Sequence, residues 1–173
     1  FVGTAGNDEA AELKLRSFRQ AGVDLSRLVV RDGPENQVVL VCVDEETGER
    51  VFSGLGAFGA DPLRAEDLDR GYITQADYLH LDGSHPEAAL QAARWMREAG
   101  KPVMLDGSKT DARELPPRMV EMVEHVDILV AGSGFVPALT GETDLWAAGR
   151  AALAHGPRIV VQTEGADGSY TVT

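Results

Sequence analysis

The feature that most constrains the fold of this chain is a regular alternation of short apolar segments with longer amphipathic stretches. Between residues 78 and 161, the apolar segments are separated by stretches whose apolar side chains recur at helical spacing. Short strands that alternate with helices favour βαβ units over an all-α or all-β fold. The sequence therefore predicts an α/β domain with a mainly parallel sheet, and 173 residues are enough for one domain with a core.

The expected elements follow from this spacing and from the residues that begin or end helices. Strands are expected at residues 38–43, 50–53, 78–81, 103–105, 127–130 and 159–161. Helices are expected at residues 9–21, 86–100, 112–124 and 143–154, with a short helical turn at 132–140. Ser84 is the expected cap of the second helix. Pro116 and Pro117 fit the first turn of the third helix.

Small and apolar side chains mark the buried face of two of these helices. We expect the first helix to use Ala10, Leu13, Leu15 and Phe18, and the second to use Ala89, Ala92, Ala93 and Met96, with Trp95 packed beside them. The segments at 38–43 and 50–53 flank a polar turn at 45–49. They predict a hairpin that leads into a glycine-rich segment at 54–60.

Charge and cysteine content exclude several classes of protein. The 28 acidic and 16 basic side chains give a net charge of −12, which disfavours nucleic acid or an anionic membrane as a partner. No apolar run approaches the ~20 residues that span a bilayer, and no signal peptide is visible, so we expect a cytoplasmic protein. Cys42 is the single cysteine, and its apolar surroundings predict a buried thiol.

The two ends of the sequence resemble the interior of a chain. Phe1 begins an apolar run without an initiator methionine, and residues 170–173 stop inside an expected strand. The sequence is therefore expected to be part of a longer protein.

Polar or small residues follow successive strands at their carboxyl ends. These segments are Asp82-Gly83-Ser84, Asp106-Gly107-Ser108-Lys109, Ala131-Gly132-Ser133 and Thr163-Glu164-Gly165. In a parallel sheet the carboxyl ends of the strands share one edge, and ligands of α/β proteins bind there. The sequence therefore predicts a ligand site at this edge.

The strand at 159–161 runs into a Thr-x-Gly-x-x-Gly turn that predicts nucleotide binding. Gly165 and Gly168 permit positive φ and let backbone amides approach a phosphate or an adenine, with the Thr163 hydroxyl beside them. The alternative is an ordinary hairpin with a bulge. Glu164 lies inside this turn, where its charge would oppose phosphate, so we expect it to face a ribose or the solvent.

Four polar residues at the same edge are candidates for sugar binding, namely Asp82, His85, Asp106 and Lys109. Each also has a structural interpretation. The two aspartates suit turns or caps, Lys109 can form a solvated pair with Asp111, and His85 can neighbour a helix cap. His80, His125 and His155 are too scattered to predict a metal site, and His80 is expected to be packed within its strand.

Several segments, taken in order, resemble the ribokinase-like carbohydrate kinases of the PfkB family. They are Gly3-Thr4-Ala5-Gly6-Asn7-Asp8, the hairpin with residues 54–63, Ala99 to Asp106, Leu139-Thr140-Gly141 and the turn at 162–168. The resemblance extends over nearly the whole sequence. It implies a three-layer α/β/α domain spanning residues 1–173 in part, with the hairpin at 37–53 as a small β lid or edge.

The resemblance also implies ATP-dependent phosphorylation of a small sugar with Mg²⁺, and a homodimer that pairs through the lid. Ser133, Thr163, Gly165 and Gly168 would then lie on the nucleotide side. In such kinases an aspartate in a Gly-Ala-Gly-Asp motif takes the proton of the sugar hydroxyl, and donors surround the phosphates. We expect that aspartate beyond Thr173, so no residue of this sequence is predicted to be the base.

One segment departs from the family pattern. An Asn-x-x-Glu motif, which helps to organise magnesium and phosphate, is expected seven residues before Leu139, where Gly132-Ser133-Gly134-Phe135 stands. Neither Gly132 nor Phe135 offers a ligand oxygen. The departure, with Ser84-His85-Pro86 and Leu105-Asp106, is similar to the sulfosugar kinase branch and favours an atypical, anionic sugar.

Two other classes remain open. A non-catalytic relative would keep the sugar or nucleotide site and lose phosphoryl transfer, as the missing Asn-x-x-Glu pattern permits. An unrelated dinucleotide-binding protein is disfavoured, because no Gly-x-Gly-x-x-Gly opens a helix after a first strand.

Overall fold

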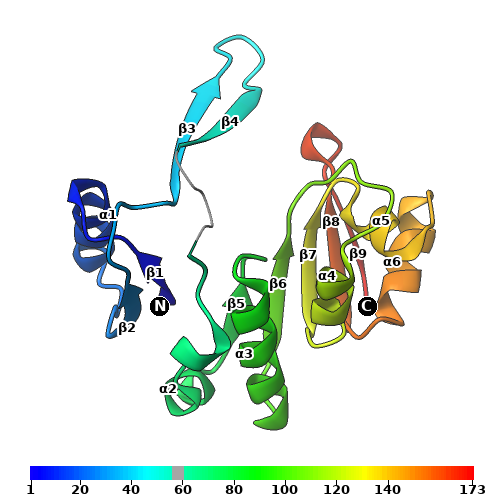
Figure 1. The fold of residues 1–173 in the computed structure, drawn as a ribbon. Helices are drawn as coiled ribbons and strands as arrows, with labels where there is room; N and C mark the ends of the chain where they lie inside the picture. Colours follow the sequence, from blue (N-terminus) through cyan, green and yellow to red (C-terminus); the bar gives the residue numbers. More distant parts are fainter. Residues whose placement is uncertain (56–60) are drawn as a thin grey trace. The chain divides into compact units, whose positions relative to one another are not determined.

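The structure is a computed structural model that describes residues 1–55 and 61–173. Contacts divide the chain into two compact units, Phe1–Asp67 and Leu68–Thr173. Figure 1 shows the helices and strands of both units. Residues 56–60 of the predicted glycine-rich segment lie outside the described residues.

The first unit begins with a βαβ arrangement. Strand β1 (Val2–Ala5) pairs in parallel with β2 (Arg27–Val30), and helix α1 (Glu9–Gln20) connects them. Asp8 caps α1, because its carboxylate accepts a hydrogen bond from the backbone N–H of Ala11. This bond also lowers the pKa of Asp8. The helix was predicted, whereas both four-residue strands were missed.

Helix α1 buries a different face from the predicted one. Ala11 and Leu15 are buried, and the Phe18 ring packs edge-on against Phe1 with 5.2 Å between ring centroids. Ala10 and Leu13 were predicted to be core residues, but both are exposed. The residues at positions i, i+4 and i+7 from Ala11 share one side of the helix, and Leu13 points elsewhere.

A buried ion pair joins α1 to the segment after β2. Lys14 Nζ lies 2.5 Å from Glu35 Oε2, and the Glu35 side chain is 2% exposed. Lys14 Nζ also donates to the carbonyl oxygen of Thr4 at 3.1 Å. The Glu35 carboxylate accepts from the backbone N–H groups of Gly6 at 3.2 Å and Gln37 at 2.9 Å. These bonds satisfy a carboxylate that would otherwise be costly to bury.

Strands β3 (Val38–Val43) and β4 (Arg50–Leu55) form the predicted hairpin, a separate two-stranded antiparallel sheet. Asp44 holds its turn by accepting from the N–H groups of Glu46 and Thr47. The prediction of a buried Cys42 is wrong, because this cysteine is exposed. Two strands alone have no second layer to cover either face, so the apolar run lies open among the described residues.

The second unit contains a five-stranded sheet in the order β5-β6-β7-β8-β9. Its strands are β5 (Leu79–Leu81), β6 (Val103–Gly107), β7 (Ile128–Gly132), β8 (Ile159–Thr163) and β9 (Ser169–Val172). The first four are parallel, and β9 is antiparallel to β8. The predicted α/β class with a mainly parallel sheet is confirmed.

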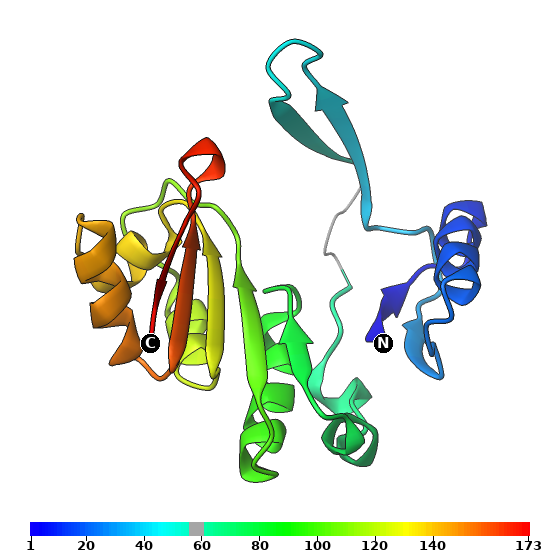
Figure 2. The same ribbon diagram turned by 180° about the vertical axis from the view of Figure 1, so that it is seen from behind.

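One helix precedes the first parallel strand of this unit, and helices connect each parallel strand to the next. They are α2 (Arg70–Gln75), α3 (Pro86–Glu98), α4 (Pro117–Val123), α5 (Phe135–Thr140) and α6 (Leu145–Leu153), with short 3₁₀ turns at Ala65–Asp67 in the first unit and Gly165–Asp167 in the second. Figure 2 shows the strands of this sheet in front of α3 and α4, so these helices cover one face of the sheet. None of the helices among the described residues is long and apolar enough to span a bilayer.

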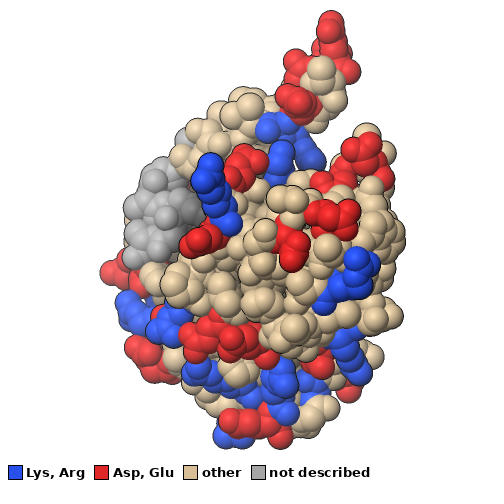
Figure 3. Space-filling view, turned by 90° about the vertical axis from the view of Figure 1, so that its right-hand side faces the viewer, with Lys and Arg blue, Asp and Glu red and all other residues tan. Residues whose placement is uncertain are grey.

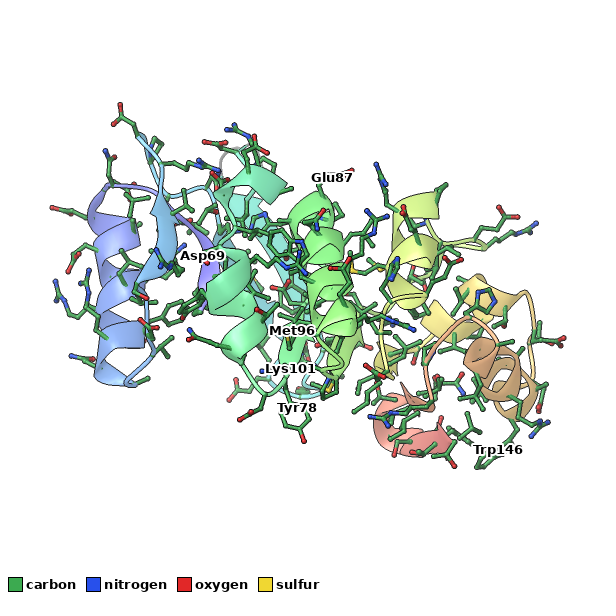
Figure 4. The ribbon with its side chains drawn as sticks, turned by 90° about the horizontal axis from the view of Figure 1, so that it is seen from below. Asp69, Tyr78, Glu87, Met96, Lys101 and Trp146 are labelled. Atoms are coloured by element: carbon green, nitrogen blue, oxygen red, sulfur yellow. The ribbon has the colours of Figure 1, made fainter. Side chains whose placement is uncertain are left out.

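The core of the second unit lies between the helices and the sheet. The predicted α3 residues Ala89, Ala92, Ala93 and Met96 are all buried, and Trp95 packs against them as expected. Figure 4 labels Met96 on α3 and Trp146 at the start of α6. Trp146 is exposed and packs edge-on against Tyr170, with 5.3 Å between ring centroids.

Three local predictions in this unit need correction. Helix α4 begins at Pro117 rather than at residue 112, because a proline disfavours helical backbone in the residue before it. The residue at the cap of α3 is His85 instead of Ser84. His80 is exposed, because alternation within β5 turns it away from the face that buries Leu81.

Candidate functional site

The carboxyl ends of β5 and β6 open into a cleft of about 320 Å³. Its polar lining comes from Asp82 and Ser84 after β5, from Asp106 near the end of β6, and from Ser108, Lys109 and Thr110 after β6. Because β5 and β6 are parallel neighbours, both sets of residues emerge at one edge of the sheet. The predicted convergence of the strand ends is therefore confirmed for these two strands.

The segment after β5 contributes Asp82 and the start of α3. One carboxylate oxygen of Asp82 accepts a hydrogen bond from the backbone N–H of Ser84 at 2.9 Å, which closes a tight turn. His85 follows with a φ of 51°, the single non-glycine residue with positive φ in the described chain. Such backbone conformations cost of order 1 kcal/mol or more and often occur near binding sites. Asp82 lines the cleft, whereas His85, the N-cap residue of α3, is not part of its lining.

The segment after β6 supplies most of the polar surface. Asp106, Ser108 and Lys109 are exposed and line the cleft with Thr110. Among the described residues, Asp82 and Asp106 are the two carboxylates and Lys109 the one ammonium group on this lining. Oxygens of this kind accept hydrogen bonds from sugar hydroxyls, and an ammonium donates to anionic oxygen.

The opposite wall of the cleft is apolar and was not predicted. Leu115, Pro116 and Met119 contribute from the segment that begins α4, and the buried Phe135 contributes from α5. No signal in the sequence marks this apolar lining, because apolar side chains at the start of a helix can face either a core or a cleft, and tertiary packing decides which. A cleft with one polar and one apolar wall suits a ligand that carries hydroxyl groups on a carbon frame.

Ser133, after β7, links the cleft to the predicted nucleotide turn. Its carbonyl oxygen accepts from the backbone N–H of Thr110 at 3.0 Å. Its hydroxyl donates to Oε2 of Glu164 at 2.6 Å and lies 3.3 Å from the carbonyl oxygen of Thr163. Glu164, which was expected to face a ribose or the solvent, is half-buried and accepts this hydrogen bond.

The turn at 163–168 connects β8 to β9. Gly165 and Gly168 have φ of 57° and 92°, as the glycine spacing predicted, and a Cβ at either would meet open space. The Thr163 hydroxyl donates to the carbonyl oxygen of Ala131 at 3.2 Å. This geometry fits both interpretations of the turn, the hairpin and the exposed cradle of backbone amides. These three residues do not line the cleft, which lies beyond Ser133.

The surface charge is mixed on the face shown in Figure 3. Acidic and basic side chains are interspersed there over the tan surface. This distribution agrees with the excess of acidic over basic residues in the sequence and offers no extended basic field for a polyanion.

The side chains at the strand ends fit Mg²⁺ poorly. Within residues 1–55 and 61–173, no three His, Cys, Asp or Glu side chains gather to hold a metal ion. Gly132 has no side-chain ligand and Phe135 is 3% exposed and apolar, so the Asn-x-x-Glu positions do not fit the metal. Asp82 and Asp106 are carboxylates on the cleft lining, and carboxylate oxygens are the ligands that Mg²⁺ prefers.

The chain is similar in sequence and in structure to several sugar kinases. The chain is 29% identical over 139 residues to an ATP-dependent ribose-1-phosphate kinase from Halopiger xanaduensis. The matched region covers 80% of this chain and 45% of that relative. Arabidopsis thaliana ribokinase, solved with ribose and ATP, has a TM-score of 0.76 at 23% identity, over 99% of this chain and 56% of that chain. A candidate ribokinase II from E. coli, solved with ATP and Mg²⁺, has a TM-score of 0.74 at 19% identity. This match covers 99% of this chain and 60% of that chain.

The structural neighbours confirm the predicted ribokinase-like fold. The chain spans about half the length of these relatives. The family model described as pfkB family carbohydrate kinase matches residues 1–173. The chain therefore belongs to the pfkB family of carbohydrate kinases.

Proposed function

We propose that the protein containing this chain transfers the γ-phosphoryl group of ATP to a hydroxyl group of a sugar. The observation that carries this proposal is the cleft at the ends of β5 and β6, with carboxylates, hydroxyls and an ammonium on one wall and apolar side chains on the other. In the transfer, the sugar oxygen forms a bond to phosphorus, the bond to the ADP oxygen breaks, and the hydroxyl proton leaves to a base. No residue of this chain is assigned as that base.

The sugar side of the proposed site uses Asp82, His85, Asp106 and Lys109. The carboxylates of Asp82 and Asp106 accept hydrogen bonds from hydroxyl groups, and the apolar wall contacts the carbon frame. His85 caps α3 in the segment that follows Asp82, outside the cleft lining, and is assigned to the sugar side through its place at this helix start. The distinct walls would fix the sugar in one orientation, which favours in-line transfer.

The nucleotide side uses the turn after β8. Thr163, Gly165 and Gly168 present a hydroxyl group and unobstructed backbone, and Ser133 ties this turn to the cleft. ATP is the proposed nucleotide, with Mg²⁺ bound to its phosphates to spread their charge. The residues at 132 and 135 do not hold the metal themselves, so the proposal gives them no part in metal binding.

Kinase activity is testable with the full-length protein. A coupled assay of ADP release, run over neutral sugars, phosphosugars and sugar acids with Mg²⁺, should show turnover with a ketose or a related sugar acid. The ribose-1-phosphate kinase among the relatives makes ribose 1-phosphate a further acceptor for the panel. Asp106→Asn should raise KM for the sugar, because a carboxylate is the stronger acceptor of a hydroxyl hydrogen bond. ADP release that is the same with and without every sugar would contradict the proposal.

A second candidate function is binding of a sugar or nucleotide without transfer. The specific observation in its favour is the lack of ligand oxygens at Gly132 and Phe135. The same assay separates the two functions when it is combined with calorimetry, because a binder would release heat on titration with sugar and produce no ADP.

The hairpin of β3 and β4 is proposed to act as a lid that pairs with the lid of a second copy. Residues directly opposite in the ladder share a face, so Val39, Val41, Val43 and Phe52 lie together on one side. All four are exposed in the described chain. A second hairpin would cover this face and its unpaired strand edges. A cytoplasmic location is part of the same proposal, which treats residues 1–173 as part of one kinase domain.

A further inference from the structure

The loops after β6 and β7 pack closely against each other through their backbones. A Cβ at Gly132 would come within 2.6 Å of the backbone nitrogen of Lys109, and a Cβ at Gly134 would overlap the carbonyl oxygen of Thr110. Thr110 N–H also donates to the Ser133 carbonyl at 3.0 Å. Only glycine allows this approach at 132 and 134, so the sequence of the β7 loop determines where the β6 loop lies.

A third glycine fixes the other end of the same loop. A Cβ at Gly107 would come within 2.9 Å of the ring of Phe135. Gly107 and Phe135 are both buried, and Phe135 also forms part of the apolar wall. The segment 107–110 is therefore held at both ends, against Phe135 on one side and against Gly132 and Gly134 on the other.

The segment 107–110, held in this way, places Lys109 on the lining of the cleft. The lysine lines the cleft, its side chain is exposed, and no ion pair joins it to Asp111 or to any other described residue. The sequence-based alternative of a solvated Lys109–Asp111 pair is therefore absent from this structure. Every other charged side chain on the lining is a carboxylate, so Lys109 alone can neutralise an anion there.

We propose that Gly132 and Gly134 are positioning residues that seat Lys109 so that its ammonium group binds an anionic oxygen group in the cleft. The inference rests on the proposed kinase function and deepens it. The anion is a phosphoryl or carboxylate group, which the nucleotide or the sugar can supply. Gly132 therefore has two consequences: it offers no side-chain ligand for a metal, and it allows the close approach of the Lys109 backbone.

Substitutions in the full-length protein test this inference by steady-state kinetics with ATP, ribose and ribose 1-phosphate. Lys109→Met should raise KM for the substrate whose anion it binds by about tenfold or more, as expected for loss of a charged hydrogen bond. Lys109→Arg keeps the charge and should restore most of this loss. Arg113→Met is the matched control, because Arg113 is exposed nearby and does not line the cleft.

The glycines need a separate test, since a structural defect would also reduce activity. Gly132 lacks a positive φ, so Gly132→Ala introduces only the close approach to Lys109, and it should raise the same KM as Lys109→Met while kcat changes less. Gly71→Ala is its control, because the new Cβ would meet only the flexible end of Asp69 at 3.3 Å. If Gly132→Ala lowered kcat alone and left the KM values for ATP, ribose and ribose 1-phosphate unchanged, the positioning role would be refuted.

The pattern of KM values identifies the source of the anion. A rise for ribose 1-phosphate with unchanged KM for ATP and ribose assigns the sugar's group, and a rise for ATP with either acceptor assigns the nucleotide's phosphates. Unchanged values for Lys109→Met, in a protein that phosphorylates sugar, would overturn the inference and leave the kinase function standing.

Anion binding provides a readout that does not depend on transfer. Titration with inorganic pyrophosphate should shift the amide signals of Thr110 and Ser133 in the wild-type ¹H–¹⁵N spectrum, and Lys109→Met should abolish these shifts. A protein that binds pyrophosphate in this way but phosphorylates no sugar would refute the kinase function and keep the anion site. Equal binding by both variants would refute the anion site.

Discussion

Replacing Glu35 by glutamine should lower the free energy of unfolding of the Phe1–Asp67 unit by about 3 kcal/mol. The substitution leaves the Lys14 ammonium, whose side chain is 23% exposed, without its carboxylate partner. It also weakens the hydrogen bonds from the N–H groups of Gly6 and Gln37, because an amide oxygen is a poorer acceptor than a carboxylate. The partial exposure of Lys14 places the effect at the lower end of the range for a broken buried pair.

The measurement must follow this unit specifically. The two tryptophans, Trp95 and Trp146, lie in the Leu68–Thr173 unit, so their fluorescence reports on the other unit. Hydrogen exchange of the β1 and β2 amides in urea reports on the first unit. Glu12→Gln is the matched control, since its pair with Arg19 is about half exposed and should matter by less than about 1 kcal/mol. Equal effects of Glu35→Gln and Glu12→Gln would contradict the role of the buried pair.

Acid should remove the same stabilisation. Burial acts to raise the pKa of Glu35, but hydrogen bonds from Lys14, Gln37 and Gly6 outweigh it, and the pKa lies below the ordinary value of 4.5. A carboxyl group with a lowered folded-state pKa contributes its full stability above 4.5 and loses it as the pH falls through the folded-state pKa. The difference in stability between wild type and Glu35→Gln should therefore shrink in acid. A difference that grew as the pH fell would contradict this sign.

Replacing Phe52 by aspartate should weaken self-association of the full-length protein by about 100-fold or more. Phe52 is 66% exposed and lies directly opposite Val41, which is 44% exposed, on the apolar face proposed to pair with a second copy. Loss of a buried aromatic anchor at an interface costs about 2 to 4 kcal/mol, and an uncompensated carboxylate adds a desolvation penalty. Every 1.4 kcal/mol corresponds to about tenfold in affinity.

Analytical ultracentrifugation over a range of concentrations measures this effect. Glu45→Lys is the control, because it changes the charge at the exposed turn and leaves both strands intact. Ser53→Asp places a carboxylate on the opposite face of the same strand, so it tells which face is covered. A monomeric wild-type protein, or a Phe52→Asp variant that associates as tightly as wild type, would contradict the lid dimer.

Local signals in the sequence predicted the elements that have clear boundaries. Pro86 begins α3 and Gly100, with a φ of 68°, follows its end, as the expected helix at 86–100 requires. Strands β1 and β2 were missed because each has four residues and β1 contains Gly3 and Thr4, which weaken its apolar pattern. Short strands acquire their pairing from parallel neighbours that are distant in sequence, and apolar spacing does not report this.

The polar half of the cleft was predictable and the apolar half was not. Asp82, Asp106 and Lys109 lie at or just after the carboxyl ends of β5 and β6, so topology alone places them at one edge. Leu115, Met119 and Phe135 reach the cleft from the segments at α4 and α5, through tertiary packing. Cys42 was predicted to be buried and is exposed, because an apolar run predicts burial without identifying the element that would cover it.

The central claim is that the ends of β5 and β6 hold the sugar while the turn after β8 holds the nucleotide. Amide chemical shifts of the full-length protein, titrated separately with ADP and with the sugar that serves as acceptor in the coupled assay, test it most directly. The account predicts that sugar shifts signals from residues 82–84 and 106–110, and that ADP shifts signals from residues 163–168. Sugar-induced shifts confined to other parts of the chain, or ADP-induced shifts that leave the 163–168 turn unchanged, would contradict it.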